Sequence, residues 1–249
     1  MVDIVVCENP KHSLKLLNNL GIKKKLFSLH DYNENILIKR IEKYQLNSSI
    51  ALISDAGSPL ISDPGYKLVL DYINKKLMVT TIPGPSSVIS ALQLSGLPMH
   101  NFKFYGFVSK TNAMIKSLAK EVAGSSSTSV LFVSGSRIMG LLKILSEIKI
   151  NRGIAVCKEM TKKNEMVFRG SVKEVSEQIS SEINNFKGEF VVIVGGSSKK
   201  IMKIDYLIQQ QIESLLKKFS LTEVVEIVHK LTSISKKEIY KTALVIKND

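Results

Sequence analysis

The stretch Ser54-Asp55-Ala56-Gly57-Ser58-Pro59-Leu60-Ile61-Ser62-Asp63-Pro64-Gly65 joins a predicted strand to a predicted helix. The strand is the apolar run at residues 49–54, which has the length of a buried strand. The helix is predicted because apolar residues recur at helical spacing from Tyr66 to Ile73, with Asp63 as the expected N-cap and Pro64 in the first turn. In an open α/β sheet, such a loop lies at the carboxyl edge of the strands, where ligands bind.

The composition of this loop suits a small ligand. Gly57 allows a ligand to approach the backbone closely, and Asp55 offers an acceptor. A second loop, Pro83-Gly84-Pro85-Ser86-Ser87, follows the predicted strand at residues 78–82 and is expected at the same edge. Neither loop has the GxGxxG or phosphate-loop pattern, which disfavours NAD and ATP. Ordinary turn chemistry is the alternative to a nucleoside cofactor site formed by Ser54, Asp55, Ala56, Gly57, Ser58, Pro59, Pro83, Gly84, Ser86 and Ser87.

Strand-like and helical patterns alternate over most of the chain, which is typical of an α/β fold. We expect a first α/β domain over residues 1–98 and a second over residues 99–198. Residues 199–249 change in character and are expected to form a small helical extension.

The extension carries two helix-start signals. Ser220 and Ser235 each precede a glutamate by three residues, which is the pattern of a capping box. The helices that follow resemble a helix-turn-helix, and Lys236, Lys237 and Lys241 give the last one a basic face that could follow phosphates. The alternative is a helical scaffold that only packs on the second domain.

The composition of the chain argues against a membrane protein, a secreted protein and a metal-binding protein. No apolar run reaches the ~20 residues that a bilayer-spanning helix needs, and no secretory signal is visible, so we expect a cytoplasmic protein without a membrane association. Cys7 and Cys157 stand apart from any metal-binding pattern, and we predict reduced core thiols and no metal site. The net charge of +13 favours a nucleic-acid partner, although the lysine-rich composition of an AT-rich genome would also produce it.

The quoted stretch, followed by Ile82-Pro83-Gly84-Pro85-Ser86-Ser87 and by Ala91-Leu92-Gln93-Leu94-Ser95-Gly96-Leu97-Pro98, closely resembles the tetrapyrrole methylase superfamily. Within it, the sequence is most similar to the small-subunit ribosomal RNA methyltransferases. Further similarity lies at residues 29–34, 104–107, 158–165, 188–190 and 236–241, so that the resemblance covers nearly the whole chain in order.

The resemblance implies a two-domain tetrapyrrole-methylase-like fold with a C-terminal helix-turn-helix-like extension. It also implies a homodimer that holds S-adenosyl-L-methionine between its domains, with Phe132 among the cofactor contacts. The implied substrate is the 2′-hydroxyl of a cytidine in the decoding region of 16S rRNA in the small ribosomal subunit. The candidate RNA contacts are His30, Asn33, Glu34, Lys236, Lys237 and Lys241. For His30, capping of a turn is the alternative role.

Three departures from the family pattern stand out. The family begins with a strand and a Pro-Thr-Pro-Ile-Gly-Asn-Leu loop, and this chain is expected to be N-terminally shortened with that first strand missing. An acid and an arginine of the family are replaced here by Asn9 and Lys11, and a carboxylate is replaced by Val133. These changes bear on activity rather than on ancestry.

Methyl transfer depends chiefly on orientation, but the ribose hydroxyl must also lose its proton. We expect one of Glu159, Lys162 and Glu165, in a loop after a predicted strand, to assist this step; a solvated charge cluster is the alternative. Two rival functions are methylation of a porphyrin-like ring, against which the basic charge and the helical extension argue, and RNA binding by a non-catalytic relative that has lost its cofactor site.

Overall fold

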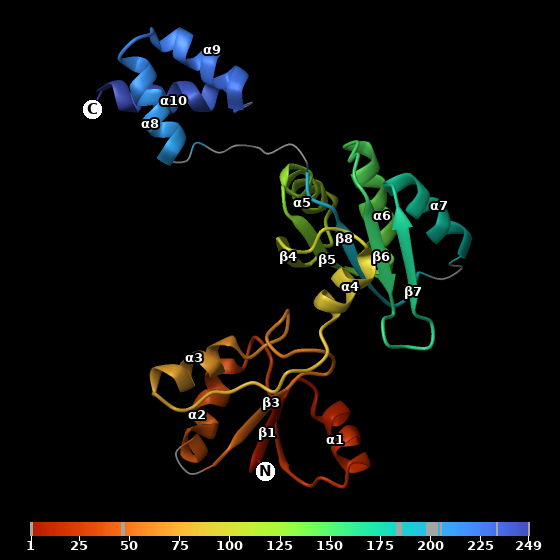
Figure 1. Ribbon diagram of the computed structural model, residues 1–249. Helices are drawn as coiled ribbons and strands as arrows, with labels where there is room; N and C mark the ends of the chain where they lie inside the picture. Colours follow the sequence, from red (N-terminus) through yellow and green to blue (C-terminus); the bar gives the residue numbers. More distant parts are fainter. Residues whose placement is uncertain are drawn as a thin grey trace.

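The computed structural model describes residues 2–45, 48–182, 186–197, 204, 206–232 and 234–248. Figure 1 shows two α/β parts and a helical part, which confirms the predicted α/β class. The first part contains β1 (Ile4–Cys7), α1 (Pro10–Asn19), β2 (Lys25–Ser28), α2 (Glu34–Gln45), β3 (Ile50–Ile53) and α3 (Tyr66–Asn74).

The first sheet is parallel, with strand order β2-β1-β3. All four residues of the central strand β1 are buried because helices cover both of its faces. Ile4 and Val6 pack with residues of α2 and α3, whereas Val5 and Cys7 pack with Leu17 of α1. This alternation is the period of two that a strand imposes on its side chains.

The predicted strand at residues 78–82 is wrong. In the described chain these residues pair with no strand, and Met78 and Ile82 are 89% and 92% exposed. Their apolar sequence suits a strand, but a strand forms only where a neighbouring strand satisfies its backbone groups.

The predicted N-cap of α3 is also wrong, because the helix begins at Tyr66 and Gly65 precedes it as the capping residue. Gly65 has φ +130°, and a Cβ at this position would lie 2.7 Å from Cδ2 of Leu52. Only glycine meets both conditions, so the chain turns into the helix two residues later than the proline pattern indicates.

The second sheet has five strands in the order β4-β5-β8-β6-β7. Strand β4 pairs with β5 in parallel, and the other pairs are antiparallel. Its elements are α4 (Ser87–Ser95), β4 (Phe102–Phe107), α5 (Asn112–Gly124), β5 (Thr128–Ser134), α6 (Gly135–Glu147), β6 (Ile154–Lys158), β7 (Met166–Gly170), α7 (Val172–Glu182) and β8 (Glu189–Val194).

Helices cover both faces of this sheet. The larger core lies on the side of α5, α6 and α7, and the smaller one lies under α4. Although α4 precedes the domain boundary expected at residue 98, Val88, Ala91 and Leu92 pack on the second sheet, and Nε of Arg169 donates to the carbonyl of Leu94 at 2.7 Å. The connection between the two sheets therefore runs through residues 75–86.

The extension consists of α8 (Tyr206–Leu216), α9 (Leu221–Thr232) and α10 (Lys236–Asn248). It has a hydrophobic core of its own, formed by residues of these helices and of the turns beside them. Ser220 and Glu223 exchange the reciprocal bonds of a capping box, and the backbone N–H of Glu238 donates to Oγ of Ser235. A self-contained core favours an independent module over a scaffold for the second domain. None of the helices in the described ranges has the length and hydropathy to cross a bilayer.

Candidate active site

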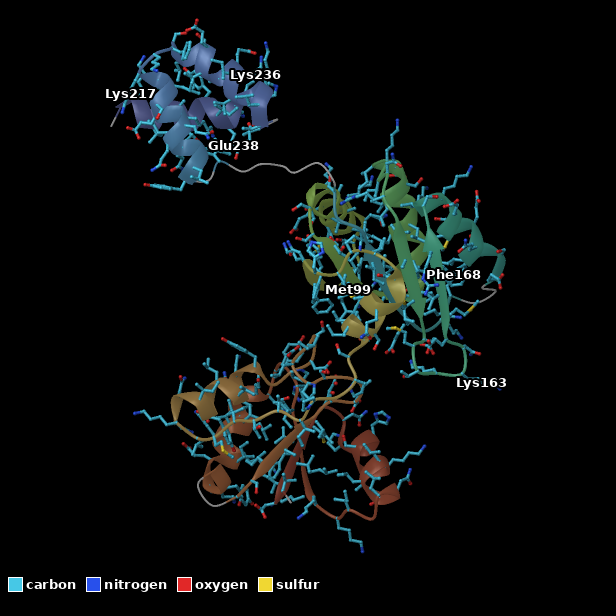
Figure 2. All side chains as sticks on the ribbon, viewed as in Figure 1. Met99, Lys163, Phe168, Lys217, Lys236 and Glu238 are labelled. Atoms are coloured by element: carbon cyan, nitrogen blue, oxygen red, sulfur yellow. The ribbon has the colours of Figure 1, made fainter. Side chains whose placement is uncertain are left out.

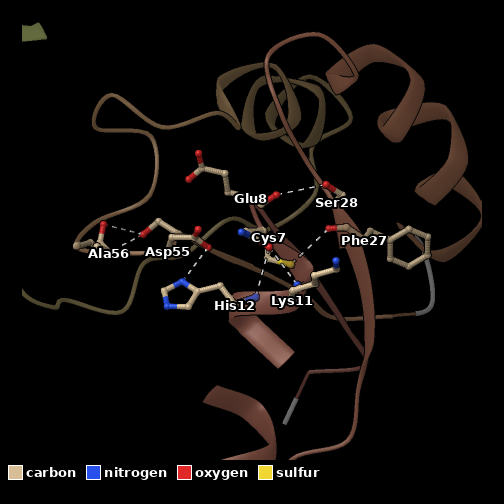
Figure 3. Close-up of polar contacts among 11 residues, drawn as sticks. Cys7, Glu8, Lys11, His12, Phe27, Ser28, Asp55 and Ala56 are labelled. Atoms are coloured by element: carbon tan, nitrogen blue, oxygen red, sulfur yellow. Dashed lines mark hydrogen bonds and ion pairs between the residues drawn. The ribbon is translucent and has the colours of Figure 1, made fainter. Parts of the chain in front are cut away.

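The carboxyl ends of β1, β2 and β3 meet at one edge of the first sheet because the three strands are parallel. Glu8 follows β1, residues 29–33 follow β2, and residues 54–65, here called the 54–65 loop, follow β3. The hydroxyl of Ser28 donates to the carbonyl of Glu8 at 3.3 Å and ties the first two ends together, as Figure 3 shows.

The beginning of the 54–65 loop is a closed turn. The hydroxyl of Ser54 donates to the carbonyls of Gly57 at 2.9 Å and Ala56 at 3.3 Å. Gly57 has φ +71°, a conformation that side chains other than glycine adopt at a cost. Ser54 and Gly57 thus shape the backbone that a ligand would meet.

The structure brings the two predicted ligand loops together. The hydroxyl of Ser58 donates to the carbonyl of Pro85 at 3.2 Å, which joins the 54–65 loop to residues 83–87, here called the 83–87 loop. A Cβ at Gly57 would lie 3.9 Å from the same carbonyl. The 54–65 loop also reaches the second domain, since a Cβ at Gly106 of β4 would lie 3.6 Å from Oγ of Ser62.

A histidine and carboxylates gather at this edge. Nδ1 of His12, in the first turn of α1, lies 3.5 Å from Oδ1 of Asp55, as Figure 3 shows. This oxygen is buried and makes no hydrogen bond in the described structure. Burial, together with the negative charges of Glu8 and Asp55, raises the pKa of Asp63 to about 6. Acidic side chains are therefore concentrated at this edge of the first sheet, although the chain as a whole has a net positive charge.

The raised pKa of Asp63 predicts a pH-dependent stability. The folded state disfavours the ionised form of Asp63. The free energy of unfolding therefore includes a favourable contribution from protonated Asp63 below the ordinary pKa of 3.8. This contribution is lost as the pH rises to about 6. Asp63→Asn should therefore stabilise the protein at pH 7.5 by roughly 1 kcal/mol, after allowance for partial exposure, and much less at pH 4.5. Thermal unfolding at both pH values measures this, with Asp31→Asn at an exposed position as control. A gain independent of pH would contradict the assignment.

Phe132 lies at the centre of an aromatic cluster on the α4 side of the second sheet. Its ring centroid is 4.8 Å from that of Phe104 and 5.2 Å from that of Phe107, both edge-on. Phe107 is 62% exposed and offers a free ring face, whereas Tyr105 packs against the larger core. Val133 is buried in that core, so the carboxylate that it replaces would not have faced Phe132.

The three predicted catalytic residues belong to the β6–β7 hairpin, whose tip carries Lys163 in Figure 2. Oε1 of Glu159 accepts from Nζ of Lys162 and from the backbone N–H of Glu189, both at 2.9 Å. The bond from Glu189 is the main cause that lowers the pKa of Glu159, and the bond to Glu159 raises the pKa of Lys162. The lowered pKa makes Glu159 a weaker base, and the raised pKa keeps Lys162 protonated, so neither side chain readily accepts a proton at neutral pH.

Glu165 also has a local partner, because its Oε2 accepts from the backbone N–H of Thr161 at 2.7 Å. Thr161 and Glu159 both have positive φ, and the three polar side chains stabilise this strained turn. These contacts favour a structural role for the trio, and their part in catalysis stays a prediction.

The candidate RNA contacts after β2 divide into two groups. Oδ1 of Asn33 accepts from the backbone N–H of His30 at 2.8 Å, so Asn33 shapes the loop while the His30 side chain remains exposed. Glu34 is only 5% exposed, and its Oε1 accepts from the backbone N–H groups of Lys67 and Leu68. Contact of Glu34 with RNA is therefore corrected to a capping role for α3, since a buried carboxylate cannot meet a polyanion.

The predicted lysines of the extension lie on α10. Lys236 forms an ion pair with Glu226 of α9, whereas Lys237 and Lys241 have no acidic partner in the described part of the chain. All three are exposed. Lys237 and Lys241 are thus the members of the set whose charge is available to phosphates.

Sequence reasoning missed His12 and Asp63 as parts of the site. Asn9, noted as a departure, is the N-cap of α1, because its Oδ1 accepts from the backbone N–H groups of Lys11 and His12. The order strand, cap and helix start would have placed His12 at the ligand edge. No group of three or more metal-ligating side chains is found among the described residues.

The chain matches the family model of the Tetrapyrrole (Corrin/Porphyrin) Methylases over residues 1–176. It is 38% identical over 196 residues to the ribosomal RNA small subunit methyltransferase I of Hydrogenobaculum sp. (strain Y04AAS1), covering 78% of this chain and 84% of that protein. For the protein of the same name from Haemophilus influenzae, identity is 34% over an alignment of 250 residues, covering 98% of this chain and 87% of the relative.

Two solved structures share the fold. The methyltransferase CobJ has a TM-score of 0.50 at 14% identity and covers 82% of this chain and 98% of its own. Diphthine synthase has a TM-score of 0.55 at 15% identity and covers 78% and 79% of the two chains. The family match and the identities above 30% show that the chain belongs to the tetrapyrrole methylase family, whose methyl donor, S-adenosylmethionine, is its cofactor.

Proposed function

We propose that the chain transfers a methyl group from S-adenosylmethionine to the 2′-hydroxyl of a cytidine in the decoding region of 16S rRNA. The observation that carries the proposal is the junction of the 54–65 and 83–87 loops, in a chain whose relatives are named ribosomal RNA small subunit methyltransferase I. The net charge of +13 supports a nucleic-acid substrate over a small ring.

The residues of the two loops fit the cofactor. Gly57 leaves open the space beside Pro85, which a Cβ would begin to fill, and backbone groups of both loops line that space. Bound there, S-adenosylmethionine supplies a methyl group made electrophilic by its positive sulfur. We propose that it is held by Ser54, Asp55, Ala56, Gly57, Ser58, Pro59, Pro83, Gly84, Ser86, Ser87 and, from the second domain, Phe132.

The exposed ring of His30, the loop held by Asn33, and Lys236, Lys237 and Lys241 are proposed to meet the rRNA. With this substrate, a cytoplasmic location is proposed too. A homodimer is proposed as well, and an exposed apolar stripe on α3 supports it: Tyr66, Leu70 and Ile73 are 70%, 39% and 56% exposed. Stripes of this kind are covered in protein interfaces.

Mass mapping of rRNA tests the proposal. The purified chain is incubated with S-adenosylmethionine and with small ribosomal subunits from a strain that lacks the gene. We expect one new 2′-O-methylcytidine in the decoding region, which wild-type cells carry and the deletion strain lacks. Persistence of every ribose methylation in the deletion strain would contradict the substrate, and methylation of a porphyrin-like ring alone would favour the rival enzyme. Failure to bind S-adenosylmethionine in calorimetry would favour the non-catalytic relative.

A further inference from the structure

The ribose hydroxyl needs a base to take its proton. Glu159, Lys162 and Glu165 form hydrogen bonds within and beside their own turn. We propose that His12 is the general base of the proposed methyl transfer and that Asp55 positions it. This inference rests on the proposed function and adds the group that takes the proton.

The fold brings these two side chains to the same place from distant parts of the sequence. Cys7, the last residue of β1, pairs with Ile53, the last residue of β3, so the chain segments that follow the two strands leave the sheet side by side. His12 lies in the first turn of α1 on one segment, and Asp55 is the second residue of the 54–65 loop on the other. The base and the proposed cofactor loop are therefore neighbours.

The contact has the geometry of an oriented imidazole. Nδ1 of His12 lies 3.5 Å from Oδ1 of Asp55, a separation that a small side-chain rotation shortens to a hydrogen bond, and catalytic bonds are often long before substrate binds. Oδ1 is buried and makes no hydrogen bond within the described structure, so Nδ1–H is the donor within reach. Each oxygen of the Asp55 carboxylate can accept hydrogen bonds, so the oxygen that does not face His12 can contact the cofactor.

The consequence is a defined tautomer. A carboxylate beside Nδ1 holds the proton on that nitrogen, and the lone pair of Nε2 then points away from Asp55. The side chain of His12 is 60% exposed, and no hydrogen bond occupies Nε2 in the described ranges. Nε2 is thus accessible to a hydroxyl of an incoming ribose.

The surrounding charges favour the product of proton transfer. Glu8 and Asp55 both lie close enough to Asp63 that their charges act on it, and all three carboxylates belong to this edge of the sheet. The proton that His12 takes up would place a positive charge beside the Asp55 carboxylate, because Nδ1 lies 3.5 Å from Oδ1, while Lys11 lies on the exposed side of α1. The three carboxylates would repel the phosphates of RNA, so the ribose rather than the phosphate is expected to approach His12.

In the step itself, the ribose 2′-oxygen forms a bond to the methyl carbon of S-adenosylmethionine as the bond from that carbon to sulfur breaks. The electron pair of the broken bond stays on sulfur, which becomes a neutral thioether. The hydroxyl proton passes to Nε2 of His12, and the imidazolium later releases it to water. No oxidant, metal or further reactant is required.

Single-turnover methylation of small subunits tests the role of His12. At saturating S-adenosylmethionine and rRNA, His12→Gln is expected to reduce the rate about 100-fold, which is the lower end of the usual contribution of a general base. The Kd values for the cofactor and the rRNA and the thermal unfolding midpoint should stay close to wild type. His100→Gln, at an exposed position before β4, is the matched control and should keep the full rate.

A second measurement reports on the positioning without any substrate. In nitrogen-15 NMR of the full chain, the ring nitrogens of His12 should show the Nδ1–H tautomer, and Asp55→Asn should shift the population toward Nε2–H. The inference would be overturned if His12→Gln kept the wild-type rate, or if Asp55→Asn left the tautomer population of His12 unchanged. Either result would leave the proposed function intact. A wild-type protein that binds S-adenosylmethionine but never methylates small-subunit rRNA would overturn the proposed function and this role of His12 together.

Discussion

Replacing Gly57 by alanine should raise the Kd for S-adenosylmethionine by about tenfold or more, which corresponds to ~1.4 kcal/mol of binding free energy. Two physical effects act together. The backbone at Gly57 has φ +71°, which an alanine tolerates at a cost of roughly 1–2 kcal/mol, and the added methyl group enters the space between the 54–65 and 83–87 loops, 3.9 Å from the carbonyl of Pro85. The φ strain favours a shift of the loop, and the methyl group occupies space that the ligand would otherwise fill. Titration calorimetry of the purified variant measures the change.

Gly21→Ala separates the two effects. Gly21 has φ +68° at the end of α1, and a Cβ there would meet no atom within 4 Å. The two variants should therefore lose similar stability in thermal unfolding, while only Gly57→Ala loses affinity. Equal affinities for the two variants and the wild type would show that the cofactor binds elsewhere.

The double substitution Lys237→Gln and Lys241→Gln should weaken binding to rRNA by about tenfold at physiological salt. Each lysine that contacts a phosphate releases counterions on binding, so its removal should also lower the slope of log K against log salt by about 1. The two residues project from the exposed side of α10, one turn apart. Filter binding or anisotropy with small-subunit rRNA over a series of salt concentrations measures both quantities.

Lys236→Gln is the matched control on the same helix. Because Lys236 is paired with Glu226, its charge is partly compensated, and its removal should change the affinity and the salt slope less than removal of Lys237 or Lys241 alone. S-adenosylmethionine binding should be unchanged in all of these variants, since the extension has its own core. An unchanged salt slope in the double variant would exclude α10 from the RNA interface.

The loops at the carboxyl edge of the first sheet could be predicted from the sequence because the patterns that indicate them are local. An apolar run, a glycine- and proline-rich loop and a helical pattern follow one another at residues 49–73, and parallel strands place such loops at one edge. The capping box at Ser220 and the bond from the backbone N–H of Glu238 to Oγ of Ser235 were also predicted from neighbours three residues away. In each case the interacting groups lie within one turn or one loop.

The failures concern contacts between distant segments. Residues 78–82 have the composition of a strand, yet strand formation depends on a partner elsewhere in the chain. Glu34 is a polar residue in a family motif, but the amides of Lys67 and Leu68 bury it. The polar hairpin of Glu159 and Lys162 likewise contacts Glu189 from another strand, which the local sequence does not indicate.

The sequence by itself determined the α/β class, the two loops predicted to bind the cofactor and the helical extension, because periodicity and turn chemistry act over a few residues. Only the tertiary structure joined Ser58 to Pro85, placed α4 on the second sheet, and set His12 beside Asp55. The local sequence does not indicate these contacts between distant segments. They form because the pairing of β1 with β3 and the packing of helices on both sheets minimise exposed apolar surface and unpaired backbone groups over the whole chain.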